Sequence, residues 1–384
     1  MRIGVDLRCL ASGRRSGVEE YTVGLLSALF RFDRENEYIL FFNEWRAVPV
    51  DFSWAEGFPN VSVKRFRIPN KFLNLSLWYF GRPRLDRMIG GADVFFFPNV
   101  GFAAVSRGVR VFATAHDLSF EVSPETFSLK QRLWHFILDP RRFFRRADRI
   151  FAVSESTADD LVTRYGIARE RIAVVQSGLD PAFRAYDRND PKMLSVKEKY
   201  GLPFQFILSL GAFEPRKNQI SIIRAFEALK RTRNPKFAKL SLVLAGVSGW
   251  KNREIIHAVE HSPFRGNIIL PGFVAPEDKP AFYNLASVFV YPSFYEGFGF
   301  PALEALGCGV PVIASDSTSL PEVVGDAGIL VDPYRPDDLA CALEAVLTDR
   351  DLAARLREKG LTRAKGFSWD RAAEKVLASF QKFD

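Results

Sequence analysis

The chain has 384 residues, of which 47% are hydrophobic and 26% charged, and its formal net charge is +8. This length exceeds what one hydrophobic core usually supports, so we expect two domains, and the composition excludes a disordered or collagen-like chain. The positive charge indicates an anionic partner, and nucleic acid, acidic lipid and phosphorylated small molecules all satisfy that description.

The N-terminal sequence and the apolar runs favour a cytoplasmic location. No apolar run approaches the roughly 18 residues of a membrane span. Asp6 interrupts the region where a signal peptide would need its apolar core. We therefore expect a cytoplasmic protein.

Residues that usually bind metals are too scattered to predict a metal site. Cys9, Cys308 and Cys341 show no paired spacing, which fits a reducing compartment, and we expect them to be small buried apolar residues. His257 and His261 are spaced like one face of a helix, but no third ligand is near them in the sequence. We expect neither a metal nor another cofactor.

In the first half of the chain, short apolar runs alternate with helical patterns. Residues 2–7 form such a run, a loop rich in Gly and Arg follows, and residues 18–31 have helical periodicity. Further strands are predicted at EYILFF, DVFFF, VRVFATA and RIFAVS. This alternation is typical of a parallel sheet covered by helices on both faces, and we assign residues 1–185 to it.

The second half repeats this organisation. Residues 178–203 are polar and rich in proline, which indicates the crossing between domains. Strands are then predicted at FQFILSLG, KLSLVLAG, NIILPG, SVFVYPS, VPVIAS and GILVD. The triplet 349–351, the single Asp-x-Asp match, begins a helical pattern and is better explained as acids in the first turn of a helix than as a metal motif. We assign 186–365 to a second Rossmann-like domain, expect residues 366–384 to pack back on the first, and expect a central cleft where doubly wound sheets bind nucleotides.

The most informative segment, residues 295–312, follows a predicted strand and opens a helix with YEGFGFPALEALGCGVPV. Gly297 and Gly299 allow close approach of the backbone, and the helix N-terminus suits a diphosphate. Glu296 lies in the loop and Glu304 about two helical turns further on. Carboxylates so placed suit sugar and ribose hydroxyls. The alternative is a glycine-rich turn with two solvated acids.

This segment resembles the E-x7-E signature of the family 4 glycosyltransferases, and the surrounding sequence agrees over nearly the whole chain. The resemblance implies the GT-B fold of two Rossmann-like domains and sugar transfer with retention of configuration and without a metal. It implies that Glu304 holds the donor ribose and that Glu296 lies beside the sugar and the leaving phosphate. It further implies donor contacts at these positions: Gly297, Phe298, Gly299 and Phe300 for the sugar, and Phe273, Val274 and Leu303 for the nucleotide.

A second candidate site follows the first predicted strand of the second domain, in GAFEPRKN, where Arg216 and Lys217 are adjacent. An enzyme that expels a nucleoside diphosphate without magnesium must neutralise the developing charge, and fixed cations can do so. Many relatives have Arg directly after the glycine, where this chain has Ala212, so which cation takes the α-phosphate and which the β-phosphate stays open. The alternative is two solvated charges that cap a helix.

Two segments of the first domain complete the candidate site. The loop SGRRSGVE at residues 12–19 includes Gly17, and similar loops in the family close over the donor phosphates and the acceptor. His116 and Asp117 follow a predicted strand, and His116 resembles the family's histidine near the transferred sugar. An ordinary connection and a structural histidine are the alternatives.

Two further stretches of the first domain mix basic with aromatic residues. Residues 64–87 contain seven basic residues against one acid, and residues 130–149 seven against two. Such mixtures suit a membrane interface with anionic lipid, here the inner face of the cell membrane, and they also suit helices with an apolar core side and solvated charges. We do not expect nucleic acid as a partner, because no recognised binding motif accompanies the charge.

The sequence therefore predicts a hexosyltransferase whose acceptor is a saccharide or a lipid-linked saccharide of a bacterial cell-envelope glycan. Mannose from GDP-mannose is the favoured donor, because EPRKN and FYEGFGFPALEA resemble bacterial envelope mannosyltransferases. A nucleotide-sugar 2-epimerase on the same fold and a non-catalytic saccharide-binding protein are the alternative functions.

Overall fold

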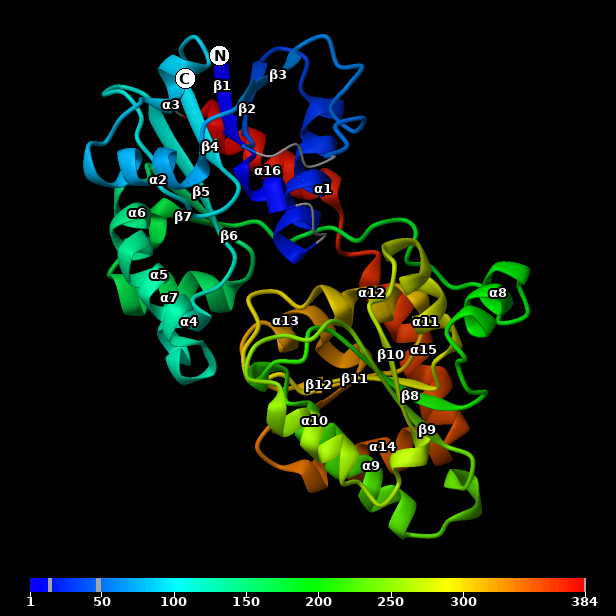
Figure 1. Ribbon diagram of the computed structural model, residues 1–384. Coiled ribbons are helices and arrows are strands. Elements are labelled where there is room, and N and C mark those ends of the chain that lie inside the picture. The colour runs from blue at the N-terminus through cyan, green and yellow to red at the C-terminus, as the bar shows by residue number, and fades with distance from the viewer. Residues whose placement is uncertain (13–15, 46–49, 383–384) are drawn as a thin grey trace. The chain divides into compact units, whose positions relative to one another are not determined.

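The computed structural model describes residues 1–12, 16–45 and 50–382. The chain divides into two compact units (Figure 1). Unit 1 comprises Met1–Leu118, Leu129–Gly178 and Ser368–Asp384, and unit 2 comprises Ser119–Ser128 and Leu179–Phe367.

The division falls earlier than residue 185, because Leu179 already belongs to unit 2. The backbone N–H of Leu179 donates to the carbonyl of Phe367 at 3.3 Å. The segment Ser119–Ser128 also belongs to unit 2, where the indole N–H of Trp250 donates to the carbonyl of Thr126 at 2.7 Å. The sequence did not predict this excursion of the chain.

Unit 1 contains a seven-stranded parallel sheet in the order β3-β2-β1-β4-β5-β6-β7. Its strands are β1 Arg2–Asp6, β2 Glu37–Asn43, β3 Val61–Phe66, β4 Val94–Phe97, β5 Arg110–Ala115, β6 Arg149–Ala152 and β7 Ile172–Val174. The inner strands are nearly continuous buried apolar runs, as expected when helices cover both faces of a sheet. The edge strands β3 and β7 were not predicted, because β3 is half exposed and β7 is very short.

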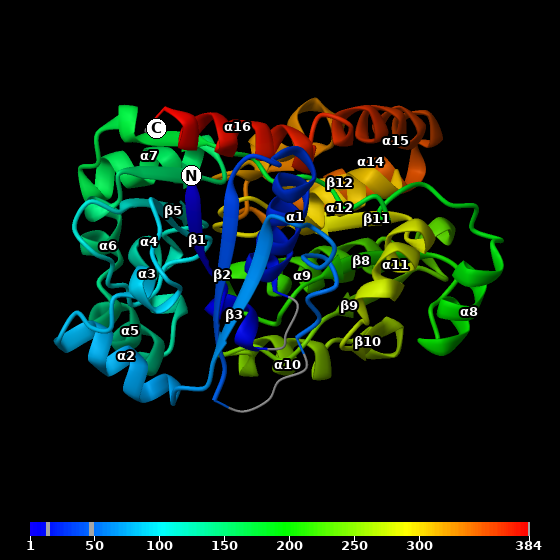
Figure 2. The ribbon, with the colours of Figure 1, turned by 90° about the horizontal axis from the view of Figure 1, so that it is seen from above.

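The helices of unit 1 are α1 Gly17–Phe32, α2 Asn70–Tyr79, α3 Leu85–Met88, α5 Leu129–Leu138, α6 Pro140–Arg146, α7 Glu155–Tyr165 and α16 Trp369–Gln381. The last helix, α16, packs on the first, α1, although they lie at opposite ends of the chain (Figure 2). Gly24 of α1 makes room for the indole of Trp369, and Arg31 pairs with Asp370 at 2.8 Å. The C-terminal helix is therefore part of the core of unit 1.

Unit 2 contains a six-stranded parallel sheet in the order β10-β9-β8-β11-β12-β13. Its strands are β8 Phe206–Leu210, β9 Ser241–Ala245, β10 Ile268–Gly272, β11 Val288–Tyr291, β12 Val312–Ser315 and β13 Ile329–Val331. Its helices are α4 Ser119–Val122, α8 Pro191–Lys199, α9 Gln219–Arg231, α10 Arg253–Glu260, α11 Lys279–Leu285, α12 Phe300–Cys308, α13 Leu320–Val324, α14 Pro336–Thr348 and α15 Arg350–Ala364.

The order of the strands in unit 2 places a switch point between β8 and β11. The chain builds outward from β8 through β9 and β10 on one side, and returns to the other side of β8 with β11. Loops that leave the carboxyl ends of two such strands diverge, which is where open α/β sheets bind ligands. The two loops with the candidate charged residues follow β8 and β11.

Three smaller expectations can now be compared with the structure. Asp349 caps α15 by accepting the N–H of Leu352 at 2.9 Å, in agreement with its prediction as a helix start. Cys341 is exposed, so its prediction as a buried residue was wrong, since it lies on the solvent side of α14. Within the described ranges, no helix has both the length and the apolar character needed to cross a membrane.

Candidate active site

The candidate site of unit 2 is built from two neighbouring loops. The loop after β8 contains a short 3-10 turn, Pro215–Lys217, and the loop after β11 contains Glu296 and leads into α12. Because β8 and β11 are parallel neighbours in the sheet, their carboxyl ends lie side by side. The structure thus brings Arg216 and Lys217 to Glu296, although about 80 residues separate them in the sequence.

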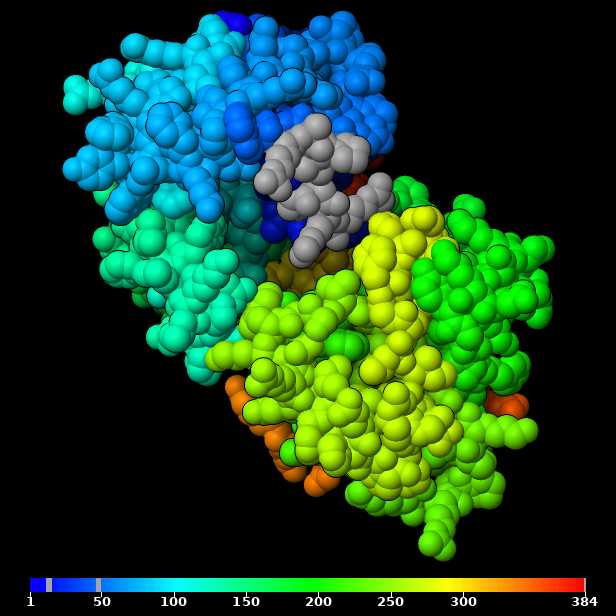
Figure 3. Space-filling model, viewed as in Figure 1, coloured from blue at the N-terminus to red at the C-terminus, as the bar shows by residue number. Residues whose placement is uncertain are grey.

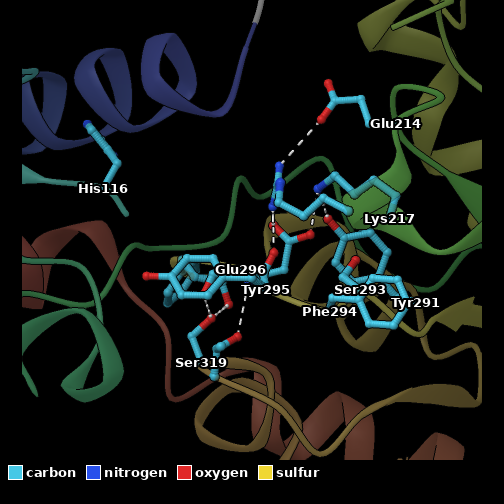
Figure 4. Close-up of polar contacts among 12 residues, drawn as sticks. His116, Glu214, Lys217, Tyr291, Ser293, Phe294, Tyr295, Glu296 and Ser319 are labelled. Carbon is cyan, nitrogen blue, oxygen red and sulfur yellow. Dashed lines mark hydrogen bonds and ion pairs between the residues drawn. The ribbon is translucent and has the colours of Figure 1, made fainter. Parts of the chain in front are cut away.

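Both oxygens of the Glu296 carboxylate are ion-paired. Oε1 is 2.6 Å from Nζ of Lys217, and Oε2 is 3.0 Å from Nη1 of Arg216. Nη1 of Arg216 also donates to the carbonyl of Tyr295 at 2.6 Å, and Lys217 donates to the hydroxyl of Tyr291 at 2.5 Å. Figure 4 shows Lys217, Tyr291 and Glu296 pointing toward one another. The side chains of both cations are only 14% exposed, so this cluster is largely shielded from water.

The electrostatics of this cluster fix the charge of Glu296. Burial alone would raise the pKa of Glu296, but the charges of Arg216 and Lys217 outweigh it and lower the pKa to about 2. Burial also lowers the pKa of Lys217, and the like charge of Arg216 adds to this while Glu296 opposes it. The lowered pKa of Lys217 is compatible with the lowered pKa of Glu296, because Lys217 faces the cation Arg216 as well as the carboxylate of Glu296. Glu296 is therefore a permanent carboxylate near neutral pH and cannot serve as a proton donor.

Hydroxyl groups from the segment after β12 hold the loop of Glu296 in place. Ser315 donates to the carbonyl of Ser293 at 2.6 Å, and Ser317 donates to the carbonyl of Phe294 at 3.0 Å. Ser319 donates to the carbonyls of Glu296 and Phe298 at 2.9 Å each. The hydroxyl oxygen of Thr318 accepts the N–H of Glu296 at 3.0 Å. Because Ser319 is fully buried, its two bonds replace water contacts that the loop carbonyls would otherwise need.

A glycine sets the start of α12. Gly299 has φ +106°, and a Cβ there would lie 2.6 Å from Cδ2 of Leu320, so a larger residue would be both strained and crowded. Phe300 then begins the helix with Pro301 in its first turn, and the N–H groups of Ala302 and Leu303 donate to the carbonyl of Gly299 at 3.0 and 3.3 Å. The aligned peptide dipoles make this end of the helix positive. This end adjoins the loop of Glu296, and the arrangement suits an anionic ligand.

Glu304 belongs to a different cluster from Glu296. It lies on α12, is 1% exposed, and accepts the hydroxyl of Tyr283 at 2.5 Å on Oε2. Nζ of Lys279 approaches Oε1 at 3.5 Å. Burial and the charge of Glu304 raise the pKa of Tyr283 well above its ordinary value, so Tyr283 stays a donor. The sequence did not reveal Tyr283 or Lys279, because both lie on α11, which has no distinctive motif.

The other predicted residues of unit 2 follow strand ends or lie in α12. Phe273 is exposed and Val274 is buried in the loop after β10, and Leu303 is buried in α12 beside Glu304. Ala212 lies two residues after the end of β8. These positions remain candidates for contacts with a nucleotide.

In unit 1, His116 follows β5 and has a defined tautomer. Its Nε2 lies 2.8 Å from the carbonyl of Pro98, which can only accept, so Nε2 bears the proton and Nδ1 is an acceptor. Burial lowers the pKa of His116 below its ordinary value, so the ring is neutral near pH 7. The ring of Tyr21 stands edge-on at 4.8 Å. Both a packed structural histidine and a polar contact to a ligand are compatible with this setting.

The remaining candidates of unit 1 lie close in sequence to the elements that position them. Gly17 is the first residue of α1, and Asp117 follows His116 after β5. Residues 13–15 of the predicted loop lie outside the described residues. At the end of that loop, the N–H of Ser16 donates to the carboxylate of Glu19 at 2.6 Å, which caps α1.

The fold and the site define a class of protein, and comparison with known sequences defines the family. Two Rossmann-like units, one with a buried cation–carboxylate cluster at its switch point, are typical of α/β proteins that bind a ligand beyond the carboxyl ends of their strands. The family described as Glycosyltransferase Family 4 matches residues 15–183, and that described as Glycosyl transferases group 1 matches residues 195–363. The O-antigen chain mannosyltransferase B of Escherichia coli is 33% identical over 273 residues, which cover 71% of this chain and 70% of that protein. The chain belongs to the family 4 glycosyltransferases.

Other relatives agree with this assignment. The serotype-specific mannosyltransferase WbdA of E. coli is 33% identical over 275 residues, so the chain spans only 33% of that longer protein. Among solved structures, sucrose-phosphate synthase from Thermosynechococcus elongatus has a TM-score of 0.75 at 19% identity, covering 100% of this chain and 98% of that one. Anabaena Alr3699/HepE in complex with UDP-glucose has a TM-score of 0.72 at 17% identity, covering 100% of each chain. These structures confirm the GT-B fold.

Proposed function

We propose that this glycosyltransferase moves a hexose, with mannose from GDP-mannose favoured, to a saccharide or lipid-linked saccharide acceptor. The reaction would serve synthesis of a cell-envelope glycan in the cytoplasm, with retention of configuration and without a metal. The relatives named as mannosyltransferases support mannose as the transferred sugar, and the name of the O-antigen relative supports the pathway class. The observation that carries the proposal is the buried cluster of Arg216, Lys217 and Glu296.

In this proposal Arg216 and Lys217 stabilise the leaving diphosphate. As the bond from the sugar to the phosphate oxygen breaks, negative charge grows on that oxygen, and fixed cations in a water-poor site stabilise it most effectively. The cluster has two cations and two carboxylates, Glu214 and Glu296, paired within 4 Å. A diphosphate would therefore share these cations with the carboxylates. Glu296 would hold Arg216 and Lys217 in position before the diphosphate binds.

Glu296 would accept hydrogen bonds from hydroxyls of the donor sugar. Because its pKa is low, Glu296 neither donates nor readily accepts a proton near neutral pH, so it would not act as a general base. The proton of the attacking hydroxyl would pass to the leaving phosphate oxygen, on the same face of the sugar. The new bond from the acceptor oxygen to the anomeric carbon would form there as the bond to phosphate breaks, and configuration would be retained.

Glu304 and His116 would have supporting roles. Tyr283 occupies Oε2 of Glu304, so a ribose hydroxyl would donate to Oε1, which Lys279 approaches only to 3.5 Å. His116 would accept a sugar hydroxyl on Nδ1, because Nε2 is held by the carbonyl of Pro98. Neither role requires a change in protonation during the reaction.

A donor panel tests this proposal. GDP, UDP, ADP and their sugars are added at equal concentration while thermal unfolding of the full chain is followed. A ligand at about 100 times its dissociation constant adds about 2.7 kcal/mol to the stability of the unit that binds it. GDP-mannose should raise the unfolding temperature most. Preferential protection by a UDP or ADP sugar would refute the donor, and no protection by any nucleotide would refute the proposal as a whole.

A further inference from the structure

The outward face of α2 is apolar. Leu73 and Leu77 face the core, as in any amphipathic helix, but the opposite side exposes Phe72, Leu75 and Tyr79, with Tyr79 72% exposed. Trp78 and Phe80 beside them are exposed as well. A surface helix normally has polar residues on the side away from the core, so this helix is apolar on both sides. Figure 3 shows side chains of this region, in blue, standing out from the surface of unit 1.

A second exposed apolar stripe runs along α5. Leu129, Leu133 and Phe136 follow one another at intervals of four and three residues, which places them on one face, and Phe136 is 82% exposed. Ile137 and Trp134 widen this stripe, whereas Leu138 points inward. Figures 1 and 2 both place α5 on the same side of unit 1 as α2. We call the exposed apolar residues of α2 and α5, with Phe80, the apolar face.

Exposed basic residues flank the two helices of the apolar face in the sequence. They include Lys64, Arg67, Lys71, Arg82, Lys130, Arg132, Arg141 and Arg142. The acids do not offset them: Asp86 is buried and accepts the N–H of Ser106, and Asp148 pairs with Arg110. Asp139 caps α6 by accepting the N–H of Arg142 at 3.0 Å. The charge of this surface is therefore strongly positive.

We propose that the apolar face binds an anionic lipid bilayer, with its aromatic and aliphatic side chains among the headgroups and its basic residues against the lipid phosphates. The charge complements anionic lipid, and Trp and Tyr together with Lys and Arg are the residues that prefer the membrane–water interface. The exposed apolar side chains project from two separate helices, which suits a deformable lipid surface better than the core of a protein interface. The proposal concerns unit 1 alone and does not depend on which sugar is transferred.

Cosedimentation of the full chain with vesicles tests this proposal. Vesicles of phosphatidylcholine with 30% phosphatidylglycerol, at about 0.1 M salt, should bind the protein, whereas vesicles of phosphatidylcholine alone should bind it far more weakly. Binding should fall as salt rises, because screening shortens the range of the attraction from about 10 Å at 0.1 M to about 3 Å at 1 M. Wild-type protein that stays in the supernatant with anionic vesicles at low salt would overturn the proposal.

Two sets of variants separate charge from apolar contact. Each basic residue near the surface contributes about fivefold in partitioning, so losing four of them should weaken binding roughly 600-fold. Reversing Lys64, Lys71, Lys130 and Arg132 to Glu should weaken it further, because anionic lipid repels the new carboxylates. Arg145 is left intact because its guanidinium donates to the carbonyl of Tyr165. The matched control reverses four exposed bases of unit 2, Lys192, Arg233, Lys239 and Arg253, and should keep most of the binding. Equal losses in both sets would show non-specific attraction and overturn the assigned surface.

The apolar set replaces Phe72, Tyr79, Leu133 and Phe136 by Ser and should lower binding about tenfold or more without changing the unfolding temperature, because all four are exposed. The control, Phe204→Ser, removes an aromatic ring that is 83% exposed in unit 2 and should bind as wild type. Undiminished binding by the apolar set would overturn the proposal. The proposal would also be overturned if wild-type protein were an oligomer and the apolar set of substitutions converted it to monomers, because the apolar face would then join copies of the chain.

Tryptophan fluorescence gives a readout of depth. Trp78 and Trp134 lie in the apolar face, so brominated lipids should quench the fluorescence of the bound protein. The double variant Trp78→Phe, Trp134→Phe keeps two apolar rings and should therefore bind normally but lose most of the quenching. Quenching equal to that of wild type would show that another surface meets the lipid and would contradict the proposal.

Discussion

Replacing Glu296 by Gln tests the buried cluster most sharply through its pH dependence. The amide keeps the size of the side chain but leaves Arg216 and Lys217 as neighbouring buried cations without their shared carboxylate. The fall of the Glu296 pKa from 4.5 to about 2 corresponds to about 3 kcal/mol of stability at pH 7. Removing one partner of a buried ion pair costs about 3–5 kcal/mol, which agrees in magnitude.

The sign of the pH dependence follows from the direction of this shift. A carboxyl with a lowered pKa in the folded state stabilises the protein fully above its unfolded-state pKa, and the stabilisation is lost as the pH falls from 4.5 toward 2. The difference in stability between wild type and Glu296→Gln should therefore shrink by about 2 kcal/mol between pH 7 and pH 3. Lowering the pH should destabilise wild type more than the variant.

Hydrogen exchange of the amides of β8 and β11 measures this effect within unit 2, since a single melting curve of a two-unit chain mixes both transitions. The control is Asp338→Asn, which removes a carboxylate from the exposed pair with Arg335 and should stay within about 0.5 kcal/mol of wild type. A Glu296→Gln difference below about 1 kcal/mol at pH 7, or one that is the same at pH 3, would refute the reasoning.

The other predictions concern nucleotide binding, the loop and the core. Glu304→Ala should weaken nucleotide binding roughly 10- to 100-fold in a titration. Tyr283→Phe keeps the carboxylate of Glu304 and should leave nucleotide binding nearly unchanged. Equal losses of binding in both variants would show that Glu304 and Tyr283 have a purely structural role. Ser319→Ala should destabilise unit 2 by about 1–3 kcal/mol and lower turnover more than substrate affinity, and kinetics like those of wild type would contradict its positioning role. Gly24→Ala places a Cβ 2.4 Å from the indole of Trp369 and should cost about 1–3 kcal/mol in thermal unfolding, and an unchanged unfolding temperature would argue against the packing of α16 on α1.

The sequence was sufficient for the fold because the buried strands are continuous apolar runs. β8, β9, β11 and β12 are wholly buried and were all predicted. The edge strands β3 and β7 of unit 1 and the segment Ser119–Ser128 were not predicted, because β3 is half exposed, β7 is very short, and the place of the segment depends on partners distant in the sequence.

The site was predicted in part. The meeting of Glu296 with Arg216 and Lys217 follows from the neighbouring positions of β8 and β11 at a switch point, so two strand-end motifs were enough to identify them. Tyr283 and the hydroxyls after β12 could not be identified in this way, because ordinary helix and loop residues acquire their roles only through tertiary contact. Composition also could not decide which side of α2 and α5 faces outward.

The central claim is that fixed cations, and no metal, support retaining transfer. The most direct measurement is transfer from GDP-mannose to a saccharide acceptor in excess EDTA, with the anomeric configuration of the first product read by NMR, for wild type and for Lys217→Met. The account predicts full wild-type activity in EDTA, an α-linked product from the α-linked donor, and a large loss of turnover in the variant. Activity that appears only when magnesium or manganese is restored, or a β-linked product, would contradict it.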